Sequence, residues 1–154
     1  MAIARLIVCE RTGSWAAALR RVLPGGELPL RETRSLDECA AELAAAPSSV
    51  VVLEVSPGNL EAVSRLLAEW NVSFPLARGL VVTAGSLSAD DAQLLREAGA
   101  VDVVCSPRRL APWSGVVRRH SSRLPAEAMD PVEQVWASLP WAAYASGSVR
   151  DETG

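Results

Sequence analysis

The chain has 154 residues, 49% of them hydrophobic and 21% charged, a composition typical of one soluble globular domain. Its formal net charge of −3 excludes the broad positive field that attracts nucleic acid. All 15 basic residues are arginines, which excludes a P-loop lysine, a Schiff-base lysine and lysine-assisted phosphoryl chemistry.

Targeting and metal-binding signals are missing from the sequence. Met1–Arg5 leads into a predicted strand rather than forming a signal peptide, and no apolar stretch reaches the ~18–20 residues that span a bilayer. Cys9, Cys39 and Cys105 lack metal-ligand spacing and form no Cys-x-x-Cys pair. We therefore expect a cytoplasmic protein with no metal, no cofactor and no membrane or nucleic-acid partner.

Short apolar runs alternate with helical segments in the first part of the chain. Residues 5–9 form the first run, and a helical stretch with Trp15 on its apolar face follows. Residues 28–34 alternate only weakly, which suits an edge strand. A capping box at 35–38 opens a second helix, and residues 50–55 form the most apolar run of the chain.

The same alternation continues in the second part. Apolar residues at helical spacing over 60–70 precede a fourth strand at 79–84. A second capping box begins a helix over 88–99, which is followed by a fifth strand at 101–105 and a last helix at 112–124. This pattern predicts an α/β fold, a doubly wound five-stranded parallel sheet between two layers of helices.

Residues 125–154 extend beyond this unit, so we divide the chain into a domain of residues 1–124 and a C-terminal extension. The sequence at 130–133 is a third capping signal, and it precedes a short apolar stripe with Trp136, then Trp141. The last residues are small and polar, and we expect them to be disordered. The tryptophan-bearing helix either folds back over the domain or docks on another chain, because aromatic residues are favoured interface anchors.

Polar or reactive residues lie at or directly after the carboxyl ends of four of the five predicted strands. In chain order they are Cys9-Glu10, Glu54, Thr83-Ala84 and Ser106-Pro107. Together with the sequence Gly99-Ala100 before the fifth strand, they resemble the landmarks of response-regulator receiver domains. The resemblance covers about residues 4–124 and implies a flavodoxin-like fold with strand order 2-1-3-4-5.

The resemblance also implies a pocket in which most of the chemical residues have changed. Cys9 and Glu10 stand for the acidic pair that binds Mg²⁺, and Glu54 for the aspartate that accepts phosphate. The hydroxyl residue is kept as Thr83, whereas Ser106 replaces the lysine. A thiol is a poor ligand for a hard cation, and no lysine remains to hold the phosphoryl group. We therefore predict a degenerate receiver that is not an enzyme and cannot be phosphorylated.

Two interpretations of Glu54 stay open. Its carboxylate could imitate an aspartyl phosphate and hold Thr83 toward the pocket, which would fix the domain in one conformational state. Alternatively, Glu54 is an ordinary strand-end acid paired with Arg11, Arg108 or Arg109. The second interpretation is favoured because Val103 stands where the family has its aromatic switch residue.

Weaker hypotheses concern the remaining polar residues. Glu10 and Glu54 alone lack a third ligand for a divalent ion. Cys9 and Cys105 both end strands and could approach each other as a redox pair, although buried free cysteines are more common. The basic residues around His120 suit a helix C-terminus or an anionic partner.

The predicted function is a signalling or protein-interaction module whose protein partner the sequence does not identify. By resemblance, a homodimer would form through the face made of residues 88–99, 101–105 and 112–124, and the C-terminal helix with Trp136 and Trp141 is a second candidate contact. The competing interpretation is a flavodoxin-like small-molecule-binding protein or enzyme that uses the pocket at the strand carboxyl ends.

Overall fold

The computed structural model describes residues 3–23 and 28–124. Its five parallel strands lie in the order β2-β1-β3-β4-β5, which confirms the predicted α/β architecture and strand order. The strands are β1 (Leu6–Cys9), β2 (Leu30–Thr33), β3 (Val50–Glu54), β4 (Arg78–Val82) and β5 (Ala100–Val104). The helices are α1 (Ser14–Val22), α2 (Leu36–Ala45), α3 (Leu60–Ser73), α4 (Ala89–Glu97), the 3₁₀ turn η1 (Pro107–Arg109) and α5 (Trp113–Arg123).

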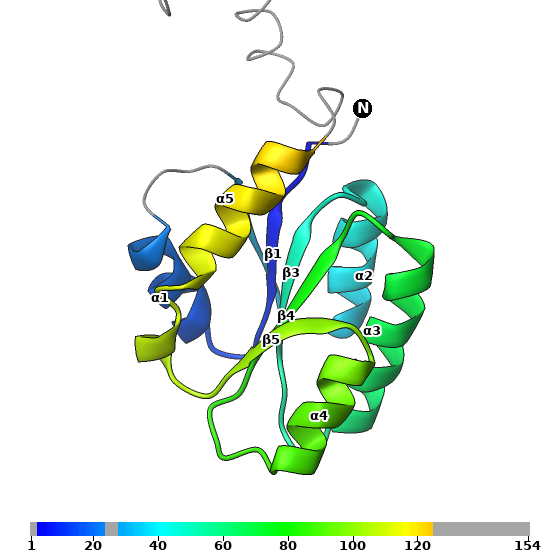
Figure 1. Ribbon diagram of the computed structural model, residues 1–154, viewed down its shortest axis with the longest axis vertical. Coiled ribbons are helices and arrows are strands. Elements are labelled where there is room, and N and C mark those ends of the chain that lie inside the picture. Colours follow the sequence, from blue (N-terminus) through cyan, green and yellow to red (C-terminus); the bar gives the residue numbers. More distant parts are fainter. Residues whose placement is uncertain (1–2, 24–27, 125–154) are drawn as a thin grey trace, which may run out of the picture.

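The helices form one layer on each face of the sheet. Helices α1 and α5 cover one face, and α2, α3 and α4 cover the other (Figure 1). Successive residues of β3 therefore enter different hydrophobic clusters: Val52 packs toward α1 and α5, and Val51 and Leu53 pack toward the other layer. A strand that is buried on both faces needs a continuous apolar run, which explains the composition of residues 50–53.

Side-chain caps set the start of two helices as predicted. The Ser35 hydroxyl accepts a hydrogen bond from the Glu38 backbone N–H at 3.1 Å, and the Ser88 hydroxyl accepts one from Asp91 at 3.0 Å. Gly99 follows the C-cap of α4 with φ +120°, a conformation that strongly favours glycine. These local signals fix where α2 and α4 join the sheet.

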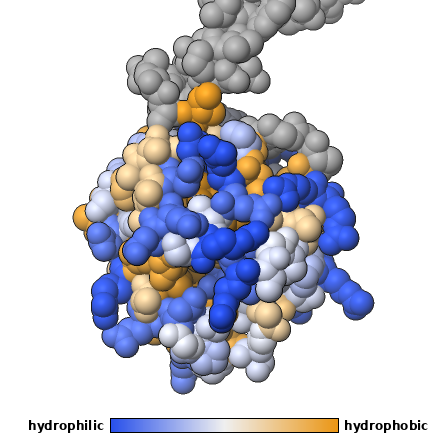
Figure 2. Space-filling model, turned by 180° about the vertical axis from the view of Figure 1, so that it is seen from behind, coloured by the Kyte–Doolittle hydropathy of each residue, from blue (hydrophilic) through white to orange (hydrophobic). Residues whose placement is uncertain are grey.

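The structure differs from the sequence-based expectation in small ways. Strand β2 is shorter than residues 28–34, and the 3₁₀ turn between β5 and α5 was not predicted. The predicted C-terminal helix, with Trp136 and Trp141, lies outside the described residues. Among the helices that are described, none is long and apolar enough to cross a membrane. The surface seen from behind is mainly hydrophilic with smaller hydrophobic areas (Figure 2).

Candidate functional site

A cavity of about 650 Å³ opens at the carboxyl ends of the strands. Parallel strands place their C-terminal loops at the same edge of the sheet, so residues from four loops meet there. Cys9, Glu10, Glu54 and Thr83 all line it, which brings together four of the five predicted pocket residues. Ser106 is not in the lining; its hydroxyl accepts a hydrogen bond from the Arg108 backbone N–H at 3.4 Å at the start of η1.

Glu10 is the most deeply buried acid near this cavity, with 2% of its surface exposed. One carboxylate oxygen accepts a hydrogen bond from the Trp15 backbone N–H at 2.8 Å, and the other accepts one from Ala16 at 2.7 Å. Both donors belong to the first turn of α1, where backbone N–H groups have no partner within the helix. Glu10 therefore caps α1 from outside the helix.

This arrangement follows from the residue at the N-cap position of α1. Gly13 occupies it with φ +86° and has no side chain to accept a hydrogen bond. A negative carboxylate at a helix N-terminus is stabilised both by the hydrogen bonds and by the helix dipole. Glu10 supplies this missing cap, which explains how an acid is accommodated almost fully out of water.

Glu54 ends β3 and points to the neighbouring loop. Its Oε2 atom accepts a hydrogen bond from the Arg11 backbone N–H at 2.9 Å. Within residues 3–23 and 28–124, no arginine side chain pairs with this carboxylate, so the predicted ion pair with Arg11, Arg108 or Arg109 is replaced by a backbone contact. The Glu54 carboxylate thus ties the end of β3 to the loop between β1 and α1.

Thr83 lies directly after β4 and is 3% exposed. Its hydroxyl accepts a hydrogen bond from the Gly85 backbone N–H at 3.3 Å and lies 3.4 Å from the Gly85 carbonyl oxygen, to which it donates. The hydroxyl is therefore engaged in its own turn rather than with Glu54. Among the described side chains, no hydrogen bond joins Thr83 to the Glu54 carboxylate. An imitation of aspartyl phosphate by Glu54 would require such a bond.

The resemblance of the sequence to receiver domains implies a magnesium ion at this edge, so we compare the oxygen and sulfur ligands present here with those that Mg²⁺ requires. Mg²⁺ prefers several oxygen ligands in octahedral geometry. Here both oxygens of Glu10 and one of Glu54 already accept backbone hydrogen bonds, and Cys9 offers a soft sulfur. In the described part of the chain, no group of three or more His, Cys, Asp or Glu residues is arranged to hold a metal. These residues do not fit a magnesium site.

The free thiol of Cys9 interacts with the thiol of Cys39, not with that of Cys105. Strands β3 and β4 separate β1 from β5, and three strand spacings amount to about 14 Å. The weaker hypothesis of a Cys9–Cys105 redox pair is therefore wrong, and the alternative of free cysteines agrees with the structure. Cys39, on α2, lies in the same buried cluster as Cys9, and a hydrogen bond from its thiol lowers the pKa of Cys9 to about 7. The same hydrogen bond, together with burial, raises the pKa of Cys39.

The sequence prediction missed Arg34 and Asn59. The Arg34 side chain lines the cavity and donates to the Glu10 carbonyl at 3.3 Å, and Glu32 holds it by an ion pair of 2.8 Å. Asn59 donates to the Glu54 carbonyl at 3.0 Å and accepts from the Ser56 backbone N–H. Arg34 directly follows β2, which pairs with β1. Because neighbouring parallel strands end at the same edge of a sheet, this position could have indicated that Arg34 lines the cavity.

No family model matches this chain, and neither does any curated protein. Solved structures do match its fold. A response regulator from Thermotoga maritima has a TM-score of 0.66 and 21% identity, covering 78% of this chain and 98% of that one. The CheY-like protein (tadZ) from Pseudomonas aeruginosa PAO1 has a TM-score of 0.59 and 21% identity, covering 80% and 97%.

A third match is the beryllofluoride-activated NtrC4 receiver domain dimer, with a TM-score of 0.61 and 17% identity over 77% of this chain and 96% of that one. Each of these solved chains is covered almost completely. The chain therefore has the flavodoxin-like fold of CheY-like response-regulator receiver domains, and the resemblance seen in the sequence is confirmed at the level of fold.

Proposed function

We propose that this chain is a receiver-like signalling module that does not accept a phosphoryl group and acts by binding another protein chain. One observation carries the proposal: the two carboxylates at the phospho-acceptor edge bind backbone N–H groups of the β1–α1 loop and of α1. Acids used in this way stabilise the loops, and with a thiol at Cys9 this edge offers few free oxygen ligands for a metal-assisted phosphoryl transfer. The three free thiols agree with a cytoplasmic location.

The absence of phosphorylation can be tested with small phosphodonors. The wild-type chain, incubated with Mg²⁺ and acetyl phosphate, is expected to show no gain of phosphoryl mass, and Mg²⁺ with beryllofluoride should leave tryptophan fluorescence unchanged. The matched variant Cys9→Asp/Glu54→Asp/Ser106→Lys restores the family residues and serves as the comparison. A phosphoryl adduct on wild-type Glu54 would overturn the proposal.

The proposed contact surface is the α4–β5–α5 face. Val101 on β5 is 49% exposed, although it is a large apolar residue. Helix α4 carries acidic residues and α5 carries arginines, so a symmetric pairing would set unlike charges opposite each other. The NtrC4 receiver domain, one of the structures with this fold, is a dimer.

Dimerisation through this face is tested by Val101→Glu. We expect the variant to be a monomer by sedimentation equilibrium at concentrations at which the wild type is a dimer, because an unpaired carboxylate would be buried in the interface. Val72→Glu is the control, since Val72 is 81% exposed on α3. Equal masses for the wild type and Val101→Glu would remove this face from the proposal.

The second candidate function is binding of a small anionic molecule in the cavity at the strand ends. Its volume of about 650 Å³ lies within the range of ligand sites, about 300–1,000 Å³. Arg11 and Arg34 both line it and would attract a negative group. A screen of organic phosphates and carboxylates by thermal shift tests this candidate: a ligand whose stabilisation is lost in Arg34→Gln favours it over the signalling module.

A further inference from the structure

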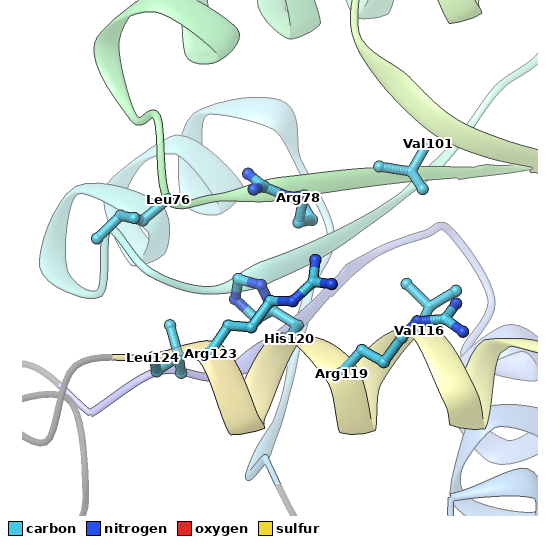
Figure 3. Close-up of a pocket in the computed structure, with 8 residues that line it drawn as sticks. All are labelled: Leu76, Arg78, Val101, Val116, Arg119, His120, Arg123 and Leu124. Carbon is cyan, nitrogen blue, oxygen red and sulfur yellow. The ribbon is translucent and has the colours of Figure 1, made fainter.

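A second groove, of about 260 Å³, lies at the amino end of the sheet. Side chains from α5, from the start of β4 and from β5 line it. Figure 3 shows His120 and Arg123 pointing from α5 toward the strand that carries Arg78. This groove is at the opposite end of the sheet from the candidate site described above, and it shares Val101 and the arginines of α5 with the α4–β5–α5 face proposed as a contact surface.

The groove is rich in positive charge. Arg78, Arg119 and Arg123 line it, and among the described residues no Asp or Glu does. Among residues 3–23 and 28–124, none of these three guanidinium groups lies within ion-pair distance of a carboxylate. Three cations around one groove repel one another, so a negatively charged occupant would be stabilised there.

Two contacts hold the groove in shape. One nitrogen of the Arg78 guanidinium donates to the carbonyl oxygens of Pro75 at 3.0 Å and Ala77 at 2.7 Å. The buried ring of His120 donates from Nε2 to the Ser48 carbonyl oxygen at 2.6 Å. Burial lowers the pKa of His120, and the charge of Arg78 acts in the same direction, so the neutral imidazole is favoured. The groove is therefore preformed.

The groove is also apolar. Leu76 is 46% exposed and Val101 is 49% exposed, and these are two of the four exposed large hydrophobic residues in the described chain. Val116 and Leu124 add further apolar surface. An occupant with carboxylates on one side and apolar side chains on the other fits this combination better than a small inorganic anion does, since it would cover both kinds of surface.

The chain itself continues from the edge of the groove into such a sequence. Leu124, the last described residue, lines the groove. Acidic residues follow at positions 127, 130 and 133, and the apolar residues Val132, Val135 and Trp136 lie between or just after them. Residues 125–154 contain five acids and one arginine, a formal charge of −4. At no more than about 3.6 Å per residue, positions 127–133 can reach all sides of the groove.

We propose that residues 127–136 of this chain occupy the groove, with Glu127, Asp130 and Glu133 facing the three arginines and Val135 or Trp136 covering Leu76 and Val101. The covalent connection at Leu124 keeps the local concentration of this segment in the millimolar range or above, so even weak charge pairing suffices to hold it there. The inference does not depend on whether Glu54 accepts phosphate.

The test uses methyl NMR of the full-length protein. In Glu127→Gln/Asp130→Asn/Glu133→Gln, the methyl resonances of Leu76, Val101 and Val116 should shift, because the segment leaves the groove. About 1 M NaCl, where the Debye length is about 3 Å, should shift the wild-type methyls in the same direction. The control Asp151→Asn/Glu152→Gln removes acids from the far end of the same extension and should leave these methyls in place. Unchanged methyls in the triple variant would overturn the proposal.

Charge exchange distinguishes pairing from an indirect effect. Arg119→Glu/Arg123→Glu should shift the same methyls, and combining it with Glu127→Arg/Glu133→Arg should return them toward wild-type positions. Far-UV circular dichroism checks that each variant is folded. Failure of the combined variant to restore the resonances, with the fold intact, argues against direct pairing and so against the proposal.

Two further outcomes identify a different occupant. If dilution of the wild type shifts the methyls as the triple variant does, the segment reaches the groove of a second copy and the intrachain arrangement is wrong. If added inorganic phosphate shifts the methyls of the wild type as much as those of the triple variant, the groove is open to free anions and the proposal is likewise wrong. We expect phosphate to act only on the triple variant.

Discussion

The charged side chains at the two ends of the sheet differ in the partners that they have. At the carboxyl end, Glu10 and Glu54 bind backbone N–H groups of the β1–α1 loop and of α1. At the amino end, three arginines surround a groove without a carboxylate among the described residues. In this fold the carboxyl end is where binding and catalysis are expected, yet here its acids mainly stabilise the loops. The groove arginines at the other end have no such partner among the described carboxylates.

The largest effect should come from Glu10. Glu10→Ala leaves the buried N–H groups of Trp15 and Ala16 without partners, so we expect a loss of about 2–4 kcal/mol in the free energy of unfolding, measured in urea. Glu10→Gln should cost less, because its carbonyl can still accept one hydrogen bond. Glu61→Ala, on the exposed surface of α3, is the control. A loss below about 0.5 kcal/mol in Glu10→Ala would refute the capping role.

At the amino end, the largest effect should come from His120. His120→Ala removes the hydrogen bond to the Ser48 carbonyl from a buried position, and about 1–2 kcal/mol of stability should be lost near neutral pH. The folded state lowers the pKa of His120, so the unfolded state binds its proton first as the pH falls. The wild type should therefore lose stability as the pH falls through about 6.5 toward the lowered pKa of the folded state, and the variant should lose less over that range. Parallel pH profiles would show that His120 is not the group responsible.

A smaller effect on stability, but a clear one on reactivity, is expected at the cysteine pair. In a Cys105→Ser background, the alkylation rate of Cys9 should follow a pKa of about 7. Cys39→Ala removes the hydrogen bond that lowers this pKa, so the midpoint should move toward the ordinary thiol value of 9.0. The pH dependence of the iodoacetamide reaction, followed by mass, measures both. An unchanged midpoint in Cys39→Ala would mean that another group lowers the pKa of Cys9.

The smallest effect should come from Glu54. Its hydrogen bond to the Arg11 backbone N–H is exposed, so Glu54→Ala should cost only about 0.5–1 kcal/mol in urea unfolding. If Glu54 instead imitated a phosphate and fixed a conformational state, Glu54→Ala would also change the assembly state or the methyl spectrum of the α4–β5–α5 face. Small, local changes would support the structural role, and together with a large loss in Glu10→Ala they would confirm that the carboxyl end mainly supports the fold.

Most of the fold could be predicted from the sequence because its signals are local. The alternation of apolar runs with helix-spaced segments depends on side-chain periodicity, and the caps at Ser35 and Ser88 depend on residues three positions apart. The meeting of Cys9, Glu10, Glu54 and Thr83 also followed, since parallel strands bring their carboxyl ends to one edge. The 3₁₀ turn at 107–109 was missed because three residues carry too little periodicity.

What each of those residues does was decided by tertiary structure. Nothing in the sequence near Glu10 tells whether its carboxylate faces a metal or turns back to cap α1; that depends on the left-handed Gly13 and on how the loop packs. The pairing of Cys9 with Cys39 and the three arginines around one groove join residues far apart in the chain. The sequence by itself thus determined the receiver-like fold and which residues share an edge, because these follow from periodicity and strand order. Only the packed structure determined which donors and acceptors remain open, because hydrogen-bond partners depend on side-chain positions to within a fraction of an ångström.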